Sequence, residues 1–293
     1  MESTAEDCYE VGIVIATVTD LFLRAYGHYT GYHPGKWRLF ERLYPLAQPS
    51  WNSRRMGKVD GCRFDCDLHD YVQREIYYLG LEPHQVKYLR KFVNPGWTVL
   101  DVGANCGYYS VLMAKWVGER GRVYAFEPSP RNLPALRRNL DLNHGAKVQV
   151  CQAALGDRAG FCDMEETEAG NFGMDRIGSG SSIPVTTLDS WLKENSVPRV
   201  DFIKVDIEGS ETRFLRGAAA TLREFRPAML IEINPGALSR FESTEEELEG
   251  TLRELQYDLF DFNWTGIVPY RRPPGKDWFR TVLALRCRQG VRP

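Results

Sequence analysis

A sharp turn follows the apolar run that ends at Asp101, and its residues could hold a cofactor. Gly103 and Gly107 lie in this turn, and a glycine lets the main chain approach a ligand closely because it has no Cβ atom. A dinucleotide fingerprint reads G-x-G-x-x-G, whereas Asn105 displaces the second glycine here. The acid that opens the turn would repel a phosphate and attract a cation. The turn therefore disfavours a dinucleotide, and with it a nicotinamide-dependent oxidoreductase.

Glu127 ends the next apolar run, one strand–helix–strand unit after Asp101. In nucleotide-binding folds an acid at that place accepts hydrogen bonds from the ribose hydroxyls. S-adenosylmethionine (AdoMet) combines a ribose with positively charged ammonium and sulfonium groups and carries no phosphate, so it suits both acids. The alternative is a pair of helix-capping turns that contain acids incidentally. The spacing between the glycine turn and Glu127 favours AdoMet.

The sequence IKVDIEG combines a lysine with acids near the end of another apolar run. Lys204 and Asp206 are two positions apart and share one face of a strand, while Glu208 lies where the strand ends. Glu232 ends the following apolar run, which we expect to form a neighbouring strand. Three carboxylates at one sheet edge are costly in free energy unless they are paired, protonated or bridged by a cation.

Three roles remain open for this acidic cluster. In the first, Asp206 or Glu208 acts as a base or orients the acceptor, because an alcohol must lose its proton to be methylated. In the second, Lys204 and the acids form a structural or cofactor-orienting network. In the third, the hard oxygens of Asp206, Glu208 and Glu232 bind a divalent metal. We expect no metal, because the paired aspartates of magnesium-dependent O-methyltransferases are missing.

His69 is a second candidate base, because its segment LHDYVQR could fold over a cleft and histidine titrates near neutral pH. Asp70 and Arg74 in the same segment could orient an acceptor or the cofactor carboxylate. The alternative for all three is an ordinary place on the surface or in the packing.

The segment NWTGIVPYRRPPG, residues 263–275, follows a predicted strand and could shape an acceptor pocket. Trp264 and Tyr270 would stack on a sugar or another ring, and Arg271 and Arg272 would face an anionic group. The alternative is a solvated loop.

Strands alternate with helices from about residue 86, a pattern that indicates a mainly parallel sheet covered on both faces. The last two strands have no helix between them, which predicts an antiparallel edge strand. We therefore predict an α/β fold with a Rossmann-like, seven-stranded, mainly parallel sheet, one antiparallel edge strand and helices on both faces. The predicted strands are 98–103, 122–128, 147–154, 200–209, 227–234, 257–262 and 280–286. The predicted helices include 108–117, 129–143 with Ser129 as its N-cap, and 243–256.

Residues 1–85 form a predicted N-terminal extension, and residues 86–293 form the main domain. The extension should contain a hairpin that turns at Asp60-Gly61 and a helix that ends near Gly80. The apolar run VGIVIATV should lie in a helix that packs on the main domain or on a partner chain, so the extension is a lid, an acceptor-site element or a homodimer contact. The glycine-rich stretch 166–182 is either a mobile loop that acts as a lid or a surface insertion.

The composition indicates a globular enzyme of the cytoplasm. The 293 residues carry a net charge of −2 and no long basic run, so we expect no nucleic-acid partner. Seven scattered cysteines and the acidic start MESTAEDCYE suit a reducing compartment and no signal peptide. The apolar run VGIVIATV is too short to span a membrane. Cys62 and Cys66 are close, but no further cysteine or histidine completes a zinc site.

Five phrases occur in an order that closely resembles the FkbM family of class I AdoMet-dependent methyltransferases. They read LDVGANCGYYS, AFEPSPRNLPALRRNLDLN, AALGDRAG, PVTTLDSW and DFIKVDIEGSETRFLRGA, and LHDYVQREIY resembles a segment that precedes them in the family. The resemblance covers roughly residues 65–265. It implies a seven-stranded sheet, AdoMet as cofactor with S-adenosylhomocysteine as product, and O-methylation of a hydroxyl on a small molecule, natural product or sugar. Rival functions are a nucleic-acid methyltransferase and a non-catalytic AdoMet-binding scaffold.

The resemblance also assigns residues to the cofactor site. It places AdoMet against the glycine turn and the acid that follows, with the adenine beside the segment after the third strand and Asp206 near the transferred methyl group. The expected cofactor-binding residues are Asp101, Gly103, Ala104, Asn105, Gly107, Tyr108, Glu127, Pro128, Ala153, Ala154, Asp157 and Asp206. The expected catalytic residues are Asp206, Glu208, Lys204, Glu232 and His69.

Overall fold

The computed structural model describes residues 5–29, 35–47, 53–143, 147–165, 176–263, 266–275 and 278–286, with side chains only for 13–27 in the first helix and from 178 onward in the segment that starts at 176. The described chain divides between Glu82 and Pro83 into two compact units, and each unit is described by itself. Across these described residues, no helix is both long and apolar enough to cross a bilayer.

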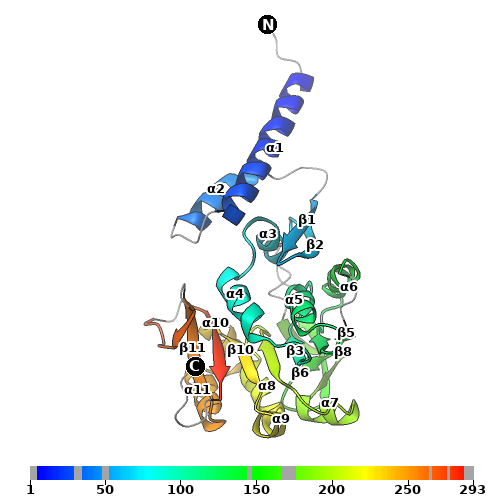
Figure 1. Cartoon of the computed structure of the whole chain (residues 1–293), viewed down its shortest axis with the longest axis vertical. Helices are drawn as coiled ribbons and strands as arrows, with labels where there is room; N and C mark the ends of the chain where they lie inside the picture. The colour runs from blue at the N-terminus through cyan, green and yellow to red at the C-terminus, as the bar shows by residue number, and fades with distance from the viewer. Residues whose placement is uncertain are drawn as a thin grey trace. The chain divides into compact units, whose positions relative to one another are not determined.

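The N-terminal unit contains three helices and one hairpin (Figure 1). The helices are α1 (Ala5–Tyr29), α2 (Lys36–Ala47) and α3 (Tyr71–Tyr78), and the hairpin pairs β1 (Arg54–Val59) with β2 (Cys62–Asp67). One face of α1 packs on α3, where Asp20 accepts hydrogen bonds from the hydroxyls of Tyr77 at 3.3 Å and Tyr78 at 2.5 Å. Leu23 on that face is fully buried.

The hairpin turns at the predicted dipeptide. Asp60 and Gly61 have φ angles of 48° and 78°, and Asp-Gly suits a turn in which both central residues are left-handed. The predicted helix at LHDYVQREIYYLG is α3, which begins because the Asp70 side chain accepts a hydrogen bond from the Gln73 amide. Both predictions are confirmed.

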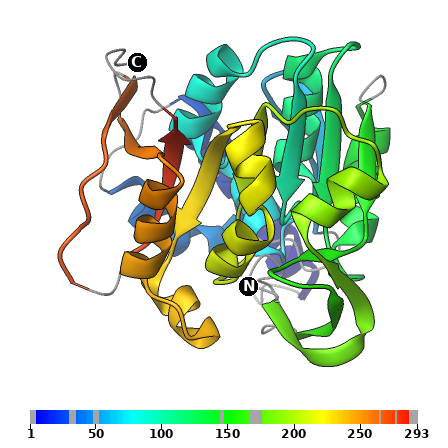
Figure 2. The ribbon, with the colours of Figure 1, turned by 90° about the horizontal axis from the view of Figure 1, so that it is seen from below.

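The C-terminal unit is built on an eight-stranded sheet in the order β12-β11-β13-β10-β9-β3-β4-β5 (Figures 1 and 2). Its strands are β3 (Thr98–Val102), β4 (Arg122–Phe126), β5 (Val148–Cys151), β9 (Phe202–Val205), β10 (Ala228–Ile233), β11 (Asp258–Asn263), β12 (Gly266–Pro269) and β13 (Arg280–Leu285). All five residues of β3 are buried, as expected for a central parallel strand covered on both faces.

The fold class is confirmed, and the sheet is mainly parallel with all seven predicted strands present. Strands β10, β9, β3, β4 and β5 run parallel, whereas β13 is antiparallel to both of its neighbours. Two details differ from the prediction. Strand β13 lies between β10 and β11 rather than at an edge, and β12 adds an eighth strand because it folds back on β11 as an antiparallel hairpin.

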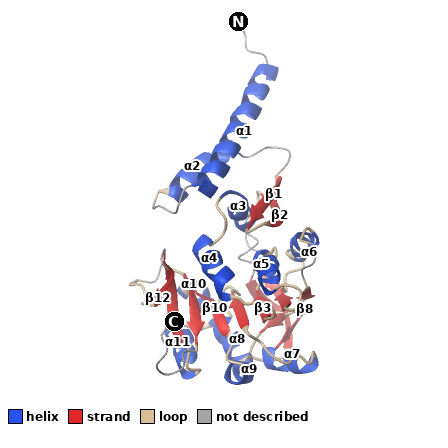
Figure 3. Ribbon diagram, viewed as in Figure 1, coloured by secondary structure: helices blue, strands red, loops and turns tan. Residues whose placement is uncertain are grey.

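Helices cover both faces of this sheet (Figure 3). One face carries α4 (Pro83–Phe92), α5 (Tyr108–Val117) and α6 (Leu133–Asp141). The other face, which is in front in Figure 2, carries α7 (Leu188–Glu194), α8 (Glu211–Gly217), α9 (Ala219–Glu224) and α11 (Glu245–Glu254). The short helices α10 (Pro235–Leu238) and η2 (Ser239–Phe241) follow β10.

A second, three-stranded sheet corrects part of the loop prediction for residues 166–182. Strand β8 (Arg176–Thr186) lies between β6 (Ala154–Leu155) and β7 (Gly160–Glu165), so residues 176–182 belong to a strand. The Gly/Ser-rich sequence of these residues has no apolar alternation, so it did not predict a strand. Backbone pairing with β7, and not burial of side chains, holds this part of β8 in the sheet. Residues 166–175 lie outside the described residues.

Candidate functional site

The glycine turn joins β3 to α5 and is held against the segment that follows β9. Gly103 has a φ of +83°, and a Cβ atom there would lie 1.8 Å from the carbonyl oxygen of Asp206. At Gly107, with a φ of +85°, a Cβ atom would lie 2.5 Å from Leu136 Cδ1. Glycine is therefore required at both positions, and the turn lies directly beside the carboxyl end of β9.

Asp101 is fully buried beneath this turn. Its Oδ2 accepts a hydrogen bond from Ser110 Oγ at 2.6 Å, and its Oδ1 lies 3.7 Å from Lys204 Nζ. Burial raises the pKa of Asp101, an effect that Lys204 and Ser110 oppose. Among the described residues, Oδ1 accepts no hydrogen bond. This oxygen therefore faces the Lys204 ammonium group, and the acid lies directly beneath the glycine turn.

Glu127, which follows β4, is buried and held in one orientation. Its Oε2 accepts a hydrogen bond from the Asn105 amide at 2.6 Å, and its Oε1 accepts one from the Ser129 amide at 2.9 Å. The Asn132 side chain donates a third at 3.4 Å. Burial raises the pKa of Glu127 to about 7, despite these hydrogen bonds. The carboxylate therefore links the glycine turn to the end of β4, and Ser129 and Asn132 are site residues that the sequence reasoning missed.

The start of α6 differs from its prediction. The N-cap is Asn132 rather than Ser129, and the helix runs from Leu133 to Asp141. Ser129 instead supplies its amide to Glu127. The predicted N-cap is wrong because proline is common in the first turn of a helix, and Pro130 fits that place by sequence. In the structure, Pro134 lies in the first turn of α6.

Other residues that were expected to bind the cofactor lie in the glycine turn or directly after it. Gly103 and Ala104 both donate their amides to Phe126 O at 3.0 Å, so they form the floor of the turn. Tyr108 is buried and packs edge-on against Tyr109, which favours a place in the core over the expected contact with the cofactor. Asn105 has a positive φ of 49°, which directs its amide to Glu127.

The proposed adenine segment follows β5. The Ala153 amide bonds to Cys151 O at 3.0 Å, whereas Ala154 is buried in β6 and pairs with Val185. Asp157 is exposed, and Pro128 is partly buried directly after Glu127. Of these residues, Ala153 follows the end of β5 and Pro128 follows the end of β4. A ligand whose ribose is bound by Glu127 would have its adenine next to these strand ends.

Lys204 ties the two strand ends together. Its Nζ donates to Gly103 O at 2.8 Å and lies 3.3 Å from Asp206 Oδ2 and 3.7 Å from Asp101 Oδ1. Because the ammonium group is buried among these oxygens, it fits the cofactor-orienting network that was one of the three predicted alternatives.

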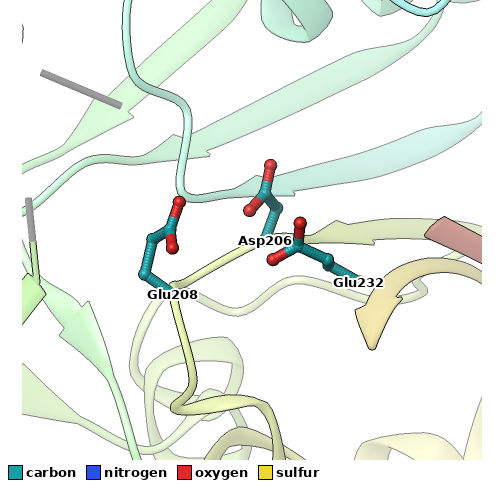
Figure 4. Close-up of side chains that lie close together, drawn as sticks. All are labelled: Asp206, Glu208 and Glu232. Atoms are coloured by element: carbon teal, nitrogen blue, oxygen red, sulfur yellow. The ribbon is translucent and has the colours of Figure 1, made fainter. Parts of the chain in front are cut away.

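The three predicted acids do come together at the carboxyl ends of β9 and β10. One oxygen from each of Asp206, Glu208 and Glu232 lies within 4.8 Å of the others (Figure 4). Burial, and then the charge of Asp206, raises the pKa of Glu208 to about 8. The Asp206 side chain is 42% exposed, so the cluster is open to a ligand. Among the described residues this is the one group of acids, histidines or cysteines close enough to hold a metal ion.

Glu211, at the start of α8, belongs to this site but was missed. It is 1% exposed, and its Oε1 accepts hydrogen bonds from the amides of Ile207 at 3.1 Å and Gly209 at 3.3 Å. Burial raises the pKa of Glu211 to about 7. The sequence signal was present, because EGSE places an acid shortly after the glycine that ends the turn, but a first-turn helical acid is usually exposed.

The three candidate site residues of the N-terminal unit, His69, Asp70 and Arg74, contact other residues of that unit. The His69 side chain is 56% exposed, with its Nδ1 3.5 Å from Asp67 Oδ1. Asp70 caps α3, and the Arg74 guanidinium lies 4.2 Å from the ring centre of Tyr44. These contacts favour packing and capping for Asp70 and Arg74, and a catalytic role for His69 stays a prediction.

Two side chains of the predicted acceptor loop bind residues of α11. Tyr270 Oη donates to Glu249 Oε1 at 3.2 Å, and the Arg272 guanidinium binds Glu249 at 3.0 Å and pairs with Glu246. Tyr270 and Arg272 therefore hold the loop to the helix instead of facing an acceptor. Arg271 is exposed, and Trp264 lies outside the described residues.

The sequence of this chain matches a known protein family. The family described as Methyltransferase FkbM domain matches residues 101–259, which include the glycine turn, Glu127 and the acidic cluster.

Curated relatives align over the same region. Hexuronic acid methyltransferase AglP of Haloferax volcanii is 26% identical over 138 residues, which are 46% of this chain and 55% of that protein. The 2-O-methyltransferase NoeI of Sinorhizobium fredii is 23% identical over 152 residues, 45% of this chain and 61% of that protein. The 31-O-demethyl-FK506 methyltransferase FkbM of Streptomyces tacrolimicus is 29% identical over 166 residues, 44% of this chain and 63% of that protein. The chain thus matches between about half and two thirds of each relative's length.

Among solved structures, methyltransferase FkbM from Methylobacillus flagellatus is similar with a TM-score of 0.41 and 20% sequence identity. The similarity covers 73% of this chain and 54% of that chain.

Proposed function

The chain belongs to the FkbM methyltransferase family, and on this premise we propose that it transfers a methyl group from AdoMet to a hydroxyl of a small molecule, natural product or sugar. One observation carries the proposal. The glycine turn after β3, Glu127 after β4 and the acids after β9 and β10 share one edge of the parallel sheet, where ligands bind in open α/β folds. A cofactor held by the first two features would have its reacting end beside the third.

The residues at the turn fit AdoMet. Gly103 and Gly107 allow the tight backbone contacts that shape the turn, and buried Glu127 is our candidate to bind the ribose hydroxyls through its carboxylate. Asp101 and Asp206 supply negative charge for the ammonium and sulfonium groups, with Lys204 holding both carboxylates in place. When bound, AdoMet supplies an electrophilic methyl group on a positively charged sulfur.

On the acceptor side, Glu208 is our candidate base. A carboxylate whose pKa is raised to about 8 is a stronger base than an exposed one, and a pKa near the working pH suits proton transfer. Asp206 and Glu232 would accept hydrogen bonds from the acceptor and hold its oxygen about 3 Å from the methyl group, as in-line transfer requires. A divalent ion could occupy the same oxygens, but the proposed mechanism does not require one.

The acceptor class is supported by the relatives. Their names describe action on a hexuronic acid, at a 2-O position and at the 31-O position of FK506. We therefore propose hydroxyl acceptors on sugars or polyketide-like natural products, and a location in the cytoplasm, where AdoMet is made.

Calorimetric titration with S-adenosylhomocysteine tests the cofactor half of the proposal. We expect wild type to bind with micromolar affinity and Glu127→Ala to bind at least about tenfold more weakly, because hydrogen bonds to a charged group contribute about 1.5–3 kcal/mol. The variant Asp141→Ala, which removes an exposed acid at the end of α6, is the control that separates a loss of the ribose contact from a loss of one negative charge.

Absence of binding to well-folded wild type would overturn the AdoMet proposal. If binding is found, methyl transfer from radiolabelled AdoMet to hexuronic acids, methyl glycosides and macrolide alcohols would identify the acceptor class, with EDTA and added magnesium testing for a metal.

The N-terminal unit is proposed as an assembly surface. On α1, Val14, Val18 and Leu21 are 60%, 60% and 61% exposed, while the opposite face packs on α3. Their i, i+4, i+7 spacing, with Phe22 alongside, is that of a helix that pairs with another helix. Pairing with a second copy of α1 is favoured over an anionic membrane surface, because the segment before this stripe, AEDCYE, is acidic.

A further inference from the structure

We propose that Glu211 is a positioning residue that holds the acceptor-side carboxylate of Glu208 in place. The inference rests on the methyl-transfer function proposed above, since it assigns Glu208 to the acceptor. Glu211 contacts the main chain beneath Glu208, because its Oε1 accepts hydrogen bonds from the amides of Ile207 and Gly209.

The turn that carries Glu208 is strained. Glu208 has a φ of 54° and Gly209 a φ of +110°, both in the region that L-residues other than glycine rarely adopt. A left-handed residue other than glycine is unfavourable and persists only when its surroundings impose it. The surroundings of Glu208 must therefore include groups that fix this turn.

The turn is fixed at both of its ends. At the start, the Asp206 amide donates to Val102 O at 3.0 Å, and Asp206 O lies against Gly103. At the end, a Cβ atom on Gly209 would lie 2.3 Å from Ala237 O, so the main chain there is pressed against α10.

Glu211 fixes the middle of the turn. One of its oxygens accepts the amides of Ile207 and Gly209, the two residues that flank Glu208. With both amides bound to one buried oxygen, the peptide planes 206–207 and 208–209 cannot rotate independently, and Glu208 lies between them. The Glu208 side chain is then directed toward Asp206 and Glu232 (Figure 4).

Removal of the Glu211 carboxylate should release the turn without unfolding the sheet. In full-length protein saturated with S-adenosylhomocysteine, we expect Glu211→Ala to accelerate amide hydrogen exchange at Ile207 and Gly209 by at least about tenfold, since both amides lose the buried acceptor oxygen that protects them. The amides of β3 should keep their exchange rates. Glu211→Gln retains an acceptor oxygen at the same reach and should restore protection.

Glu249→Ala is the matched control, because Glu249 is an equally buried acid that holds a different loop through Tyr270 and Arg272. A general loosening of the unit would raise exchange at Ile207 and Gly209 in that variant as well, and would overturn a specific role for Glu211. If Glu211→Ala does not fold, Glu211→Asp replaces it, because the shorter side chain keeps the charge and withdraws the oxygen.

The function of the turn is tested by separating binding from turnover. We expect Glu211→Ala to bind S-adenosylhomocysteine within about threefold of wild type, a difference of less than 1 kcal/mol. In the methyl-transfer assay its kcat should fall at least tenfold, with rescue by Glu211→Gln. Unchanged exchange at Ile207 and Gly209 in folded Glu211→Ala would overturn the inference. Failure of wild type to bind S-adenosylhomocysteine would instead overturn the proposed function, while the exchange data would still decide whether Glu211 holds the turn.

Discussion

At the scale of single residues, buried acids dominate the site. Burial raises the pKa of Glu127 and Glu211 to about 7 and that of Glu208 to about 8. The groups whose charges act on Glu208 come from several elements: Asp206 and Glu211 raise its pKa, and Arg240 and Lys204 lower it. Glu127 and Glu211 accept hydrogen bonds from backbone amides, and Glu208 faces the proposed acceptor. Because these side chains are buried, the folded protein becomes less stable when they ionise.

This burial predicts a falling stability with rising pH. The folded-state pKa of each acid lies above its ordinary value of 4.5, so the folded protein binds protons more tightly than the unfolded chain. Their contribution to stability is complete below pH 4.5 and is lost as the pH rises through about 7 to 8. Urea denaturation at intervals from pH 5 to 8 should show a decreasing free energy of unfolding.

Glu211→Gln should reduce that decrease, because glutamine does not titrate, whereas the exposed control Asp157→Asn should leave it unchanged. A free energy of unfolding that rises over the same interval in wild type would contradict the burial of these acids.

At the scale of elements, the site depends on contact between two turns. The turn after β3 and the segment after β9 meet main chain to main chain at Gly103 and Asp206, and Lys204 bridges them. Parallel strands bring these turns together because their carboxyl ends meet at one edge. The glycine turn and the acids that follow β9 are therefore held in direct contact with each other.

Gly103→Ala tests that contact, with Gly118→Ala as a matched control. Both glycines have positive φ angles, +83° and +63°, but a Cβ atom meets nothing within 4 Å at Gly118 and lies 1.8 Å from Asp206 O at Gly103. We expect Gly118→Ala to lower the free energy of unfolding by about 1–3 kcal/mol, the cost of placing alanine in a conformation with positive φ and extended ψ. Gly103→Ala should cost at least about 3 kcal/mol and weaken S-adenosylhomocysteine binding.

Chemical denaturation and calorimetry of the two variants provide the comparison. Equal losses of stability would show that backbone conformation alone, and not the contact with Asp206, requires glycine at position 103.

At the scale of the whole molecule, the chain consists of a C-terminal unit that contains the candidate site and an N-terminal unit that carries an exposed apolar stripe on α1. The stripe consists of Val14, Val18, Leu21 and Phe22. Exposed apolar helix faces of this kind mark interaction surfaces in proteins. The proposed assembly surface and the candidate site thus lie in different units.

A double substitution on α1 tests assembly. We expect light scattering to show a dimer for wild type and a monomer for the variant Val18→Glu/Leu21→Glu, because two charges would be buried in the helix pair. Arg42→Glu on α2 changes the net charge by the same amount on an exposed position and should remain dimeric. Both variants should bind S-adenosylhomocysteine as wild type does. A monomeric wild type would remove α1 as a dimer contact and leave the acceptor lid as the alternative.

The sequence alone determined the features that depend on local patterns. Runs of apolar residues predicted the seven strands, Asp60-Gly61 predicted the hairpin turn, and acids at strand ends predicted a cluster that includes Asp206 and Glu232. These succeed because hydrophobic periodicity and turn chemistry act over a few neighbouring residues. The parallel arrangement then brings strand ends together without further information.

Only the tertiary structure decided which side chains are bound to distant partners. Lys204 donates to Gly103 O across 101 positions of sequence, and Arg272 is held by Glu249 rather than facing an acceptor. Strand β13 enters between β10 and β11, and Glu211 is buried beneath the turn that it holds. The physical reason is the same in each case: burial and the partner of a polar group depend on which segments meet in space, and a local pattern shows only that such a partner is needed.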